Sequence, residues 1–288
     1  MLSPAQMAKA AEDAAYAKAT GKPVKSFLLG LTAGGYIALG FVFFVTSQVG
    51  ASSLAWSGGA RILGGIVFAT GLVLVVLTGA ELFTSSTLTL TARASGRITW
   101  GQLLGNWGVV YVANFLGALT MVALVYLAGT WHNAHGGWGA VVLNTALAKL
   151  QHGFLQAFTL GVLCNLLVCL AVWAAYSGRT TTDKILAVTM PIALFVAAGF
   201  EHSVANMFMV PLALLIKDTA GADFWHEAGL NRADYADLSW PNFLLDNLAP
   251  VTLGNIVGGG VMIGILYWTI FQYVEGPPKQ PPGTEQHR

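Results

Sequence analysis

The chain has 288 residues, of which 55% are hydrophobic and only 9% are charged, and its formal net charge is +1. Soluble domains carry roughly 25% charged residues, and nucleic-acid binders need a concentrated excess of basic residues. The composition therefore excludes a soluble enzyme, a disordered protein and a nucleic-acid-binding protein, and it indicates an all-α protein with the lipid bilayer as a partner.

Residues 1–25 predict a separate cytoplasmic helix. Ser3 and Gln6 have the spacing of a capping box around Pro4, and Gly21 and Pro23 end the helix near residue 20. The apolar face of this segment is mostly alanine, which is weak for a membrane anchor. We therefore expect it to dock on the protein itself or on a cytoplasmic partner.

Six segments between residues 26 and 274 are long and apolar enough to cross a membrane, which takes about 20 residues. The region is therefore expected to be a six-span domain, followed by a proline-rich, disordered cytoplasmic tail at 275–288. The spans are placed at 26–48, 61–91, 103–129, 154–176, 184–216 and 248–274.

The distribution of lysine and arginine predicts the orientation. With six spans, ten of the 14 basic residues fall on the side that holds both termini, and the positive-inside rule places that side in the cytoplasm. The long acidic segment at 217–247 then lies outside, where we interpret it as a solvated loop over the outer face.

Two spans, 61–91 and 184–216, are interrupted at membrane depth. Glycine, a carboxylate and hydroxyl residues interrupt both, at Glu81 and at Glu201, and we expect Pro191 and Pro211 to add further breaks in the second. Paired broken segments in corresponding positions predict a three-plus-three inverted repeat with its site at the midplane.

Ionisable side chains at these breaks are candidate site residues, because a charge at membrane depth costs at least ~2.5–3.5 kcal/mol. We expect Glu81 and Glu201 to have a structural role, as acceptors for backbone N–H groups freed at the breaks. His202 suits a group that meets a passing solute, with a packing histidine as the alternative. Thr84 is interpreted as the matching residue of the other break and a natural partner for the imidazole.

Other chemistry finds little support. Glu201-His202-Ser203 holds the residue types of a catalytic triad, but sequence neighbours cannot adopt its geometry. No metal or cofactor is expected, and Cys164 and Cys169 are interpreted as packing residues. An intramembrane enzyme remains a rival hypothesis, and an aquaporin-type neutral-solute pore is disfavoured because the chain has no Asn-Pro-Ala pair.

At the breaks the chain resembles the formate/nitrite transporter family, and most closely its formate-conducting bacterial members. The resemblance covers nearly the whole chain. It implies an aquaporin-like homopentamer of the bacterial inner membrane with a pore in each protomer. Glycine stripes at Gly30/Gly34 and Gly254/Gly258 suit close helix contacts between or within protomers. The motifs are Gly79-Ala80-Glu81-Leu82-Phe83-Thr84-Ser85, Ser95-Gly96-Arg97, Ser177-Gly178-Arg179, Gly199-Phe200-Glu201-His202-Ser203 and Val251-Thr252-Leu253-Gly254-Asn255.

The resemblance also implies roles for single residues. Thr84 and His202 are similar to the family's central pair, and Lys149 to the lysine that makes a vestibule electropositive. One departure is Glu81, where close relatives carry aspartate. Asn165 and Asn255 resemble polar pore neighbours, and the apolar constrictions correspond to Phe68, Leu72, Leu82, Val168 and Phe195.

The expected function is the transport of formate or related small anions, with or without a proton. A bare anion in an apolar slit pays a desolvation penalty of several kcal/mol, which Lys149 would offset and which His202 would avoid by lending a proton. Simple hydrogen bonding by His202 is the open alternative. Nitrite and hydrosulfide remain alternative substrates.

Overall fold

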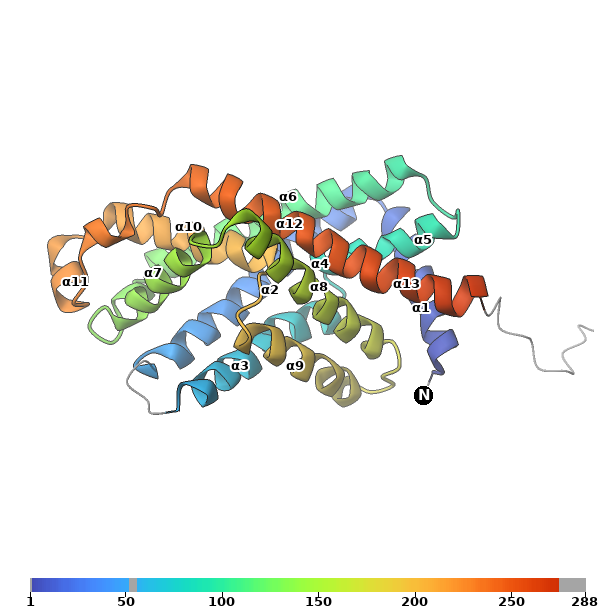
Figure 1. The fold of residues 1–288 in the computed structure, drawn as a ribbon, viewed down its shortest axis with the longest axis horizontal. Helices are drawn as coiled ribbons and strands as arrows, with labels where there is room; N and C mark the ends of the chain where they lie inside the picture. The colour runs from blue at the N-terminus through green and yellow to red at the C-terminus, as the bar shows by residue number, and fades with distance from the viewer. Residues whose placement is uncertain (1, 52–55, 275–288) are drawn as a thin grey trace, which may run out of the picture.

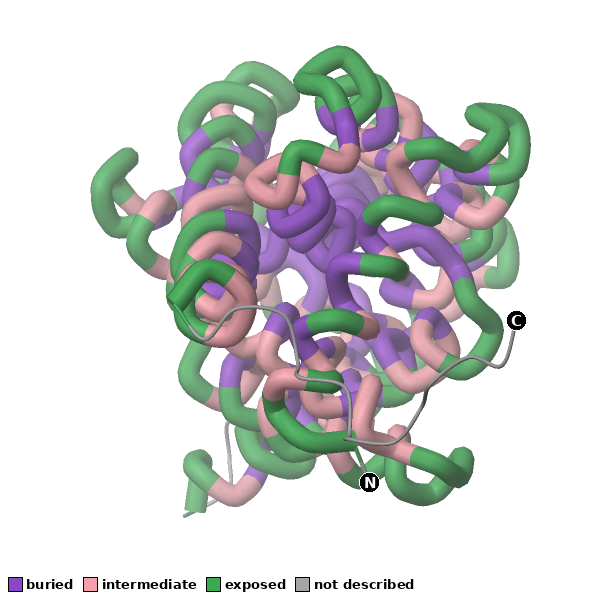
Figure 2. The backbone as a smooth tube through the Cα atoms, turned by 90° about the vertical axis from the view of Figure 1, so that its right-hand side faces the viewer, coloured by how far each residue is buried: buried purple, intermediate pink, exposed green. Residues whose placement is uncertain are grey.

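The structure is a computed structural model that describes residues 2–51 and 56–274. The predicted disordered tail, 275–288, lies outside these residues. Every regular element of the described chain is a helix, and the helices form an elongated bundle with α11 at one end and α1 at the other (Figure 1). Buried backbone runs through the middle of the bundle and exposed turns lie around it (Figure 2).

Among the described residues, five helices are long and apolar enough to span a bilayer, and they overlap five of the six predicted spans. The remaining predicted span, 184–216, is divided into α9 (Thr181–Ala197) and α10 (Ser203–Thr219). The long helices are α2 (Pro23–Gln48), α3 (Ser57–Thr78), α6 (Trp100–Leu127), α8 (Phe154–Ala175) and the continuous helical stretch Asn242–Val274. This last stretch comprises η5 (Asn242–Leu248), α12 (Ala249–Asn255), η6 (Ile256–Ile265), α13 (Leu266–Trp268) and η7 (Thr269–Val274).

Both predicted breaks lie at the glycines. Gly79 follows α3 with φ 74°, and Gly199 follows α9 with φ 75°, a left-handed backbone that favours glycine. After the first break the chain continues as α4 (Phe83–Ser86), η2 (Thr87–Thr89) and α5 (Leu90–Ala94). The expectation of further breaks at Pro191 and Pro211 is wrong, since both lie inside helices; each removes one backbone donor without ending the helix.

The N-terminal helix α1 (Pro4–Ala19) has the predicted capping box, with the Gln6 N–H donating to Ser3 Oγ and the Ser3 N–H to Gln6 Oε1. It docks on the protein itself. Ala8, Ala11 and Ala15 are buried, and Gln272 of η7 donates to the Ala8 carbonyl at 3.2 Å. Both ends of the described chain therefore lie at the same end of the bundle (Figure 1).

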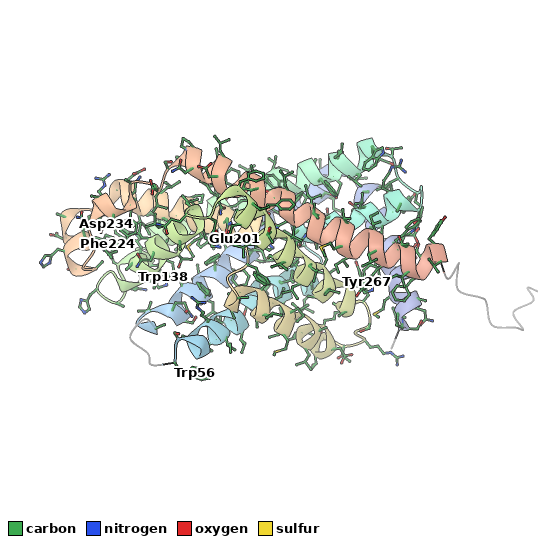
Figure 3. All side chains as sticks on the ribbon, in the orientation of Figure 1. Trp56, Trp138, Glu201, Phe224, Asp234 and Tyr267 are labelled. Carbon is green, nitrogen blue, oxygen red and sulfur yellow. The ribbon has the colours of Figure 1, made fainter. Side chains whose placement is uncertain are left out.

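At the opposite end the predicted solvated loop is a folded cap. It contains α11 (Ala222–Glu227) and η4 (Arg232–Tyr235), and it packs near η3 (Thr130–His132) and α7 (Gly137–Leu150), helices that the sequence did not indicate. Phe224 is buried with its ring 5.0 Å from that of Trp131. Figure 3 shows Phe224, Trp138 and Asp234 gathered at this end. Its aromatic residues lack a regular period, so the sequence did not reveal the burial.

The glycine stripes serve contacts inside one protomer. A Cβ on Gly34 would collide with the Asn114 carbonyl on α6, and a Cβ on Gly254 with the Phe158 carbonyl on α8. These glycines are therefore occupied by α2–α6 and α8–α12 packing, and they give no support to contacts between protomers.

Two ion pairs join α1 to the turn after α5. Arg97 contacts Glu12 at 3.1 Å and Asp13 at 2.6 Å. The Lys9 ammonium and the Arg97 guanidinium both donate to the Asp13 carboxylate, and they hold its pKa below the ordinary value for aspartate. When docking lowers a carboxyl pKa, the ionised carboxylate stabilises the docked state. This stabilisation is fully present above the carboxyl pKa of the undocked state, and it is lost as the pH falls through the lower pKa of the docked state. Docking through Asp13 therefore weakens only when the pH falls below the ordinary pKa of aspartate.

We predict that Arg97→Gln loosens α1. Surface ion pairs contribute roughly 0.2–1 kcal/mol each, so amide hydrogen exchange over α1 should accelerate about two- to tenfold while the long helices stay protected. Lys9→Gln is the matched control, because Lys9 pairs with Asp13 only within α1. Equal exchange in both variants would contradict an Arg97 anchor.

Candidate functional site

The first break is held by the amide of Asn114 on α6. Its Nδ2 donates to the Gly30 carbonyl on α2 at 2.8 Å and to the Glu81 carbonyl at 2.9 Å. Its Oδ1 accepts from the Phe83 N–H at 2.8 Å. One fully buried side chain thus satisfies the peptide groups on both sides of Leu82 and ties them to a neighbouring span.

Asn255 repeats this arrangement at the second break. Its Nδ2 donates to the Gly161 carbonyl at 2.8 Å and to the Glu201 carbonyl at 3.0 Å, and its Oδ1 accepts from the Ser203 N–H at 3.0 Å. We call Asn114 and Asn255 the asparagine clamps. Both asparagine clamps thus form interhelical hydrogen bonds, and their amides are bonded to backbone groups.

The asparagine clamps also fix the register of the repeat. Phe83 and Ser203 occupy equivalent positions, so His202 is equivalent to Leu82, and Thr84 to Val204. The interpretation of Thr84 as the repeat match of His202 is wrong. The two side chains meet because they come from different positions of the two half-helices.

Thr84 and His202 are bonded to each other as predicted, with Oγ1 and Nε2 3.0 Å apart in a buried position. The Ala205 N–H donates to Nδ1 of His202 at 3.1 Å, which makes His202 the N-cap of α10. A backbone N–H only donates, so Nδ1 carries no proton in this arrangement, and the neutral ring donates its Nε2–H to Thr84. The Phe195 ring stacks on the imidazole at 5.9 Å.

Asn165 lies beside this pair on α8. Its Nδ2 donates to the Thr84 carbonyl at 3.0 Å and lies 2.6 Å from the Asn255 carbonyl. Asn165 thus links the Thr84 segment to an asparagine clamp. Its amide N–H groups point at protein acceptors.

A cavity of about 600 Å³, which we call the outer cavity, is lined by residues of α2, α3, α7, α8 and α9 and reaches His202. Phe68 and Phe195 line it and meet edge to face at 5.7 Å. The other proposed constriction residues, Leu72, Leu82 and Val168, are buried and do not line this cavity. Charged or polar lining groups are Gln48, Arg61, Asn144, Thr145, Lys149, His152, Gln156, Glu201 and His202.

Glu201 is the buried anion of the outer half. Lys149 Nζ lies 2.8 Å from its Oε1, and the Asn206 and Asn247 amides donate to its Oε2 at 2.6 and 3.3 Å. His152 is 4.0 Å from Oε1. The expected acceptance of backbone N–H groups is wrong, because the asparagine clamps already satisfy the break and leave the carboxylate for side chains.

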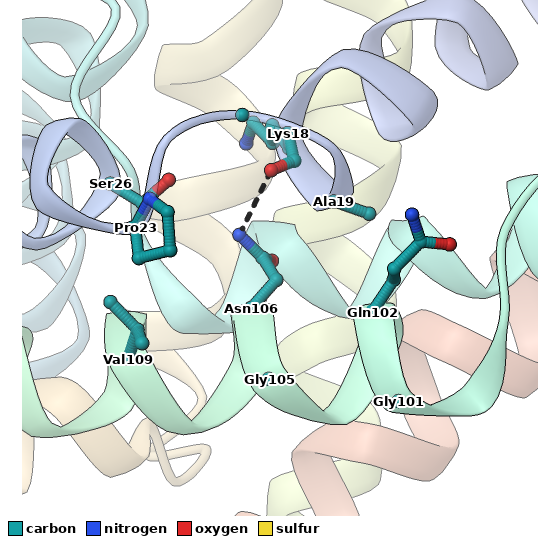
Figure 4. A pocket seen from close by; sticks show the side chains of 10 residues that line it. Lys18, Ala19, Pro23, Ser26, Gly101, Gln102, Gly105, Asn106 and Val109 are labelled. Carbon is teal, nitrogen blue, oxygen red and sulfur yellow. Dashed lines mark hydrogen bonds between the residues drawn. The ribbon is translucent and has the colours of Figure 1, made fainter.

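In the inner half, Glu81 also accepts from side chains, Ser26 at 3.2 Å and Asn106 at 3.4 Å. Asn106 donates to the Lys18 carbonyl as well (Figure 4), just as Asn247 donates to the Lys149 carbonyl at 3.0 Å. Lys18 is therefore the repeat equivalent of Lys149.

Sequence analysis missed Lys18. Its Nζ lies 3.5 Å from Ser85 Oγ, and with Lys184 it lines an inner cavity of about 180 Å³ beside the first break. A signal was present: Lys18 precedes Gly30 by as many residues as Lys149 precedes Gly161. The match goes unrecognised when residues 1–25 are assigned to a separate helix outside the six-span domain.

Fold and site together define a membrane protein in which two broken helices meet at a polar pair between two cavities. The sequence profile described as "Formate/nitrite transporter" matches residues 5–269. The chain belongs to the formate/nitrite transporter family.

Curated relatives and solved structures agree with this assignment. The chain is 50% identical over 271 residues to the formate channel FocA of Escherichia coli K12, covering 94% of this chain and 95% of that protein. It is 48% identical to the formate channel FocA of Haemophilus influenzae over 264 residues, or 92% and 93% of the two chains. A solved structure titled "Pentameric formate channel with formate bound" matches with a TM-score of 0.82 and 48% identity, over 86% of this chain and 97% of that one.

We predict that Asn114→Asp and Asn255→Asp each prevent assembly. The substitution places a carboxylate oxygen against two carbonyl oxygens in a buried site, where it has no hydrogen to donate to them. Leaving a buried charged group without a partner costs about 3 kcal/mol or more. Yield and thermal stability in mild detergent measure the loss. Asn144→Asp is the matched control. Asn144 is exposed, and its Oδ1 accepts a hydrogen bond from the Tyr235 hydroxyl at 2.7 Å, which a carboxylate can also accept. A clamp variant as stable as the wild type would contradict the interpretation.

Lys149→Gln should also destabilise the protein, since removing one partner of a buried ion pair costs about 3–5 kcal/mol. The double variant Lys149→Gln/Glu201→Gln leaves no unpaired charge and should recover most of the lost stability. The detergent melting temperature of the four proteins in this cycle is the measurement. Additive losses would show that Lys149 and Glu201 act independently.

Proposed function

We propose that this chain forms a homopentameric channel that carries formate across the bacterial inner membrane, with both termini in the cytoplasm. The family, the curated relatives that are named formate channels and the pentameric structure neighbour support the proposal. The excess of basic residues on the side of the termini supports the orientation. None of these relatives is named as an enzyme, so we assign this chain transport and no catalytic reaction.

The observation that carries the proposal is the position of the Thr84–His202 pair. His202 lies at the buried inner end of a cavity that also holds Lys149 and Arg61. Anions gather in such a cavity through its positive groups. A solute that passes Phe68 and Phe195 then reaches the two polar side chains.

Hydrogen-bond directions suit a carboxylate. Thr84 Oγ1 accepts from the neutral imidazole, so the hydroxyl hydrogen stays available for an oxygen of the passing solute. Formate would exchange part of its hydration for this donor and for Nε2–H. Proton lending needs a ring that is first protonated at Nδ1, which would displace the Ala205 N–H.

The remaining site residues take supporting roles. Phe68 and Phe195 form the outer constriction and Leu72, Leu82 and Val168 the apolar wall around the central pair. Asn165 and Asn255 orient the Thr84 and His202 segments. Glu201 holds Lys149 and two amides, and Glu81 holds Ser26 and Asn106. Lys18 is the inner counterpart of Lys149.

Substrate choice is tested by flux into liposomes that contain the purified chain. Formate, nitrite, hydrosulfide and glycerol should be compared between about pH 5 and pH 8. Formate is expected to move fastest and glycerol no faster than in empty liposomes. Faster nitrite or hydrosulfide flux would reassign the substrate, and glycerol flux would favour a neutral-solute pore.

We predict that His202→Asn keeps the pentamer and removes the acid-stimulated part of formate flux, because asparagine keeps a polar group but cannot titrate. A passive anion leak is expected to persist or grow. Thr84→Ala should weaken the same component only partly. Flux against pH in liposomes is the measurement, with exposed His226→Asn as control; wild-type pH dependence in His202→Asn would show that the histidine only braces the break.

A further inference from the structure

The charges that line the outer cavity do not all act alike. The formally charged side chains there are Arg61, Lys149 and Glu201, counting histidine as neutral. Lys149 and Glu201 lie 2.8 Å apart and neutralise each other. The net positive charge of this cavity therefore comes from Arg61.

Arg61 has no hydrogen bond or ion pair within residues 2–51 and 56–274, and its side chain is exposed. It lies in the first turns of α3, which holds no acidic residue there. A cation near a helix N-terminus is disfavoured by the helix dipole. Within the described residues, the Arg61 side chain therefore makes no interaction that stabilises α3.

Backbone around Arg61 is nevertheless fixed. Gln48 at the end of α2 donates from Nε2 to the Ala60 carbonyl at 2.9 Å, which ties the start of α3 to the cavity wall. Gln48 and Gln156 line the same cavity. The Gln48 amide hydrogens are used by Ser47 and Ala60, whereas the Gln156 side chain makes no hydrogen bond within the described residues and leaves an amide donor on the cavity wall.

We propose that Arg61 is the anion-recruiting residue of the outer vestibule, a capture site for small monovalent carboxylates, whereas Lys149 is the structural counter-ion of Glu201. This inference rests on the proposed function. A guanidinium binds a carboxylate through two parallel N–H donors. Its attraction also reaches free anions outside the mouth, because no carboxylate of the described chain neutralises it.

The test is the concentration dependence of formate uptake into vesicles whose outer face points outward, at one fixed pH. Arg61→Gln should raise the half-saturating formate concentration about three- to tenfold at low salt and leave the maximal rate unchanged, as loss of one steering charge predicts. At about 1 M salt, where the screening length is about 3 Å, the difference should vanish. Arg232→Gln is the matched control, since Arg232 lies in the outer cap and does not line the cavity.

A second variant tests the charge within one folded protein. Arg61→Cys is labelled from outside with a cationic or with a neutral methanethiosulfonate reagent; the native Cys164 and Cys169 are buried. The cationic label should restore low-salt uptake toward the wild-type value and the neutral label should not. Equal rates with both labels, or unchanged half-saturation in Arg61→Gln, would overturn the role of Arg61. Wild-type vesicles with no formate flux above empty vesicles would instead overturn the proposed function.

Discussion

Two buried asparagines hold the backbone at the two points where it leaves the helix inside the membrane. An unpaired peptide group in hydrocarbon costs several kcal/mol, and each break exposes such groups on both of its sides. Asn114 and Asn255 each satisfy two of these groups, one on either side of the break, and a third bond joins each asparagine to α2 or α8. The central pair has a fixed position only because both breaks are fixed in this way.

Because the asparagine clamps satisfy the backbone, the two glutamates are free for side chains. Glu201 gathers Lys149 and two amides, and Glu81 gathers Ser26 and Asn106. The ion pair removes the net charge of Lys149 from the outer cavity. The sequence assigned only electrostatic attraction to Lys149. The ion pair gives Lys149 a structural role, and we assign the attraction to Arg61.

The two halves share a scaffold and differ in the residues that meet a solute. Equivalent bonds place Leu82 opposite His202 in the repeat, and Val204 opposite Thr84. Each half therefore contributes one polar and one apolar group to the centre. Because the polar residue occupies a different repeat position in each half, Thr84 and His202 form a single hydrogen bond across the pseudo-symmetric centre.

Sequence alone determined the spans, the glycine breaks, the helix caps, the family and the Thr84–His202 pair. Hydropathy, capping and turn preferences are local, so a short window of residues is sufficient to identify them. The tertiary structure decided the partners of Glu81 and Glu201, the burial of the outer cap, the helical Pro191 and Pro211, and the equivalence of Lys18 and Lys149. These features depend on contacts between segments far apart in the chain, as between Lys149 and Glu201 or Asn247 and Lys149. Only the folded packing brings such groups within bonding distance and removes the water that would otherwise satisfy them.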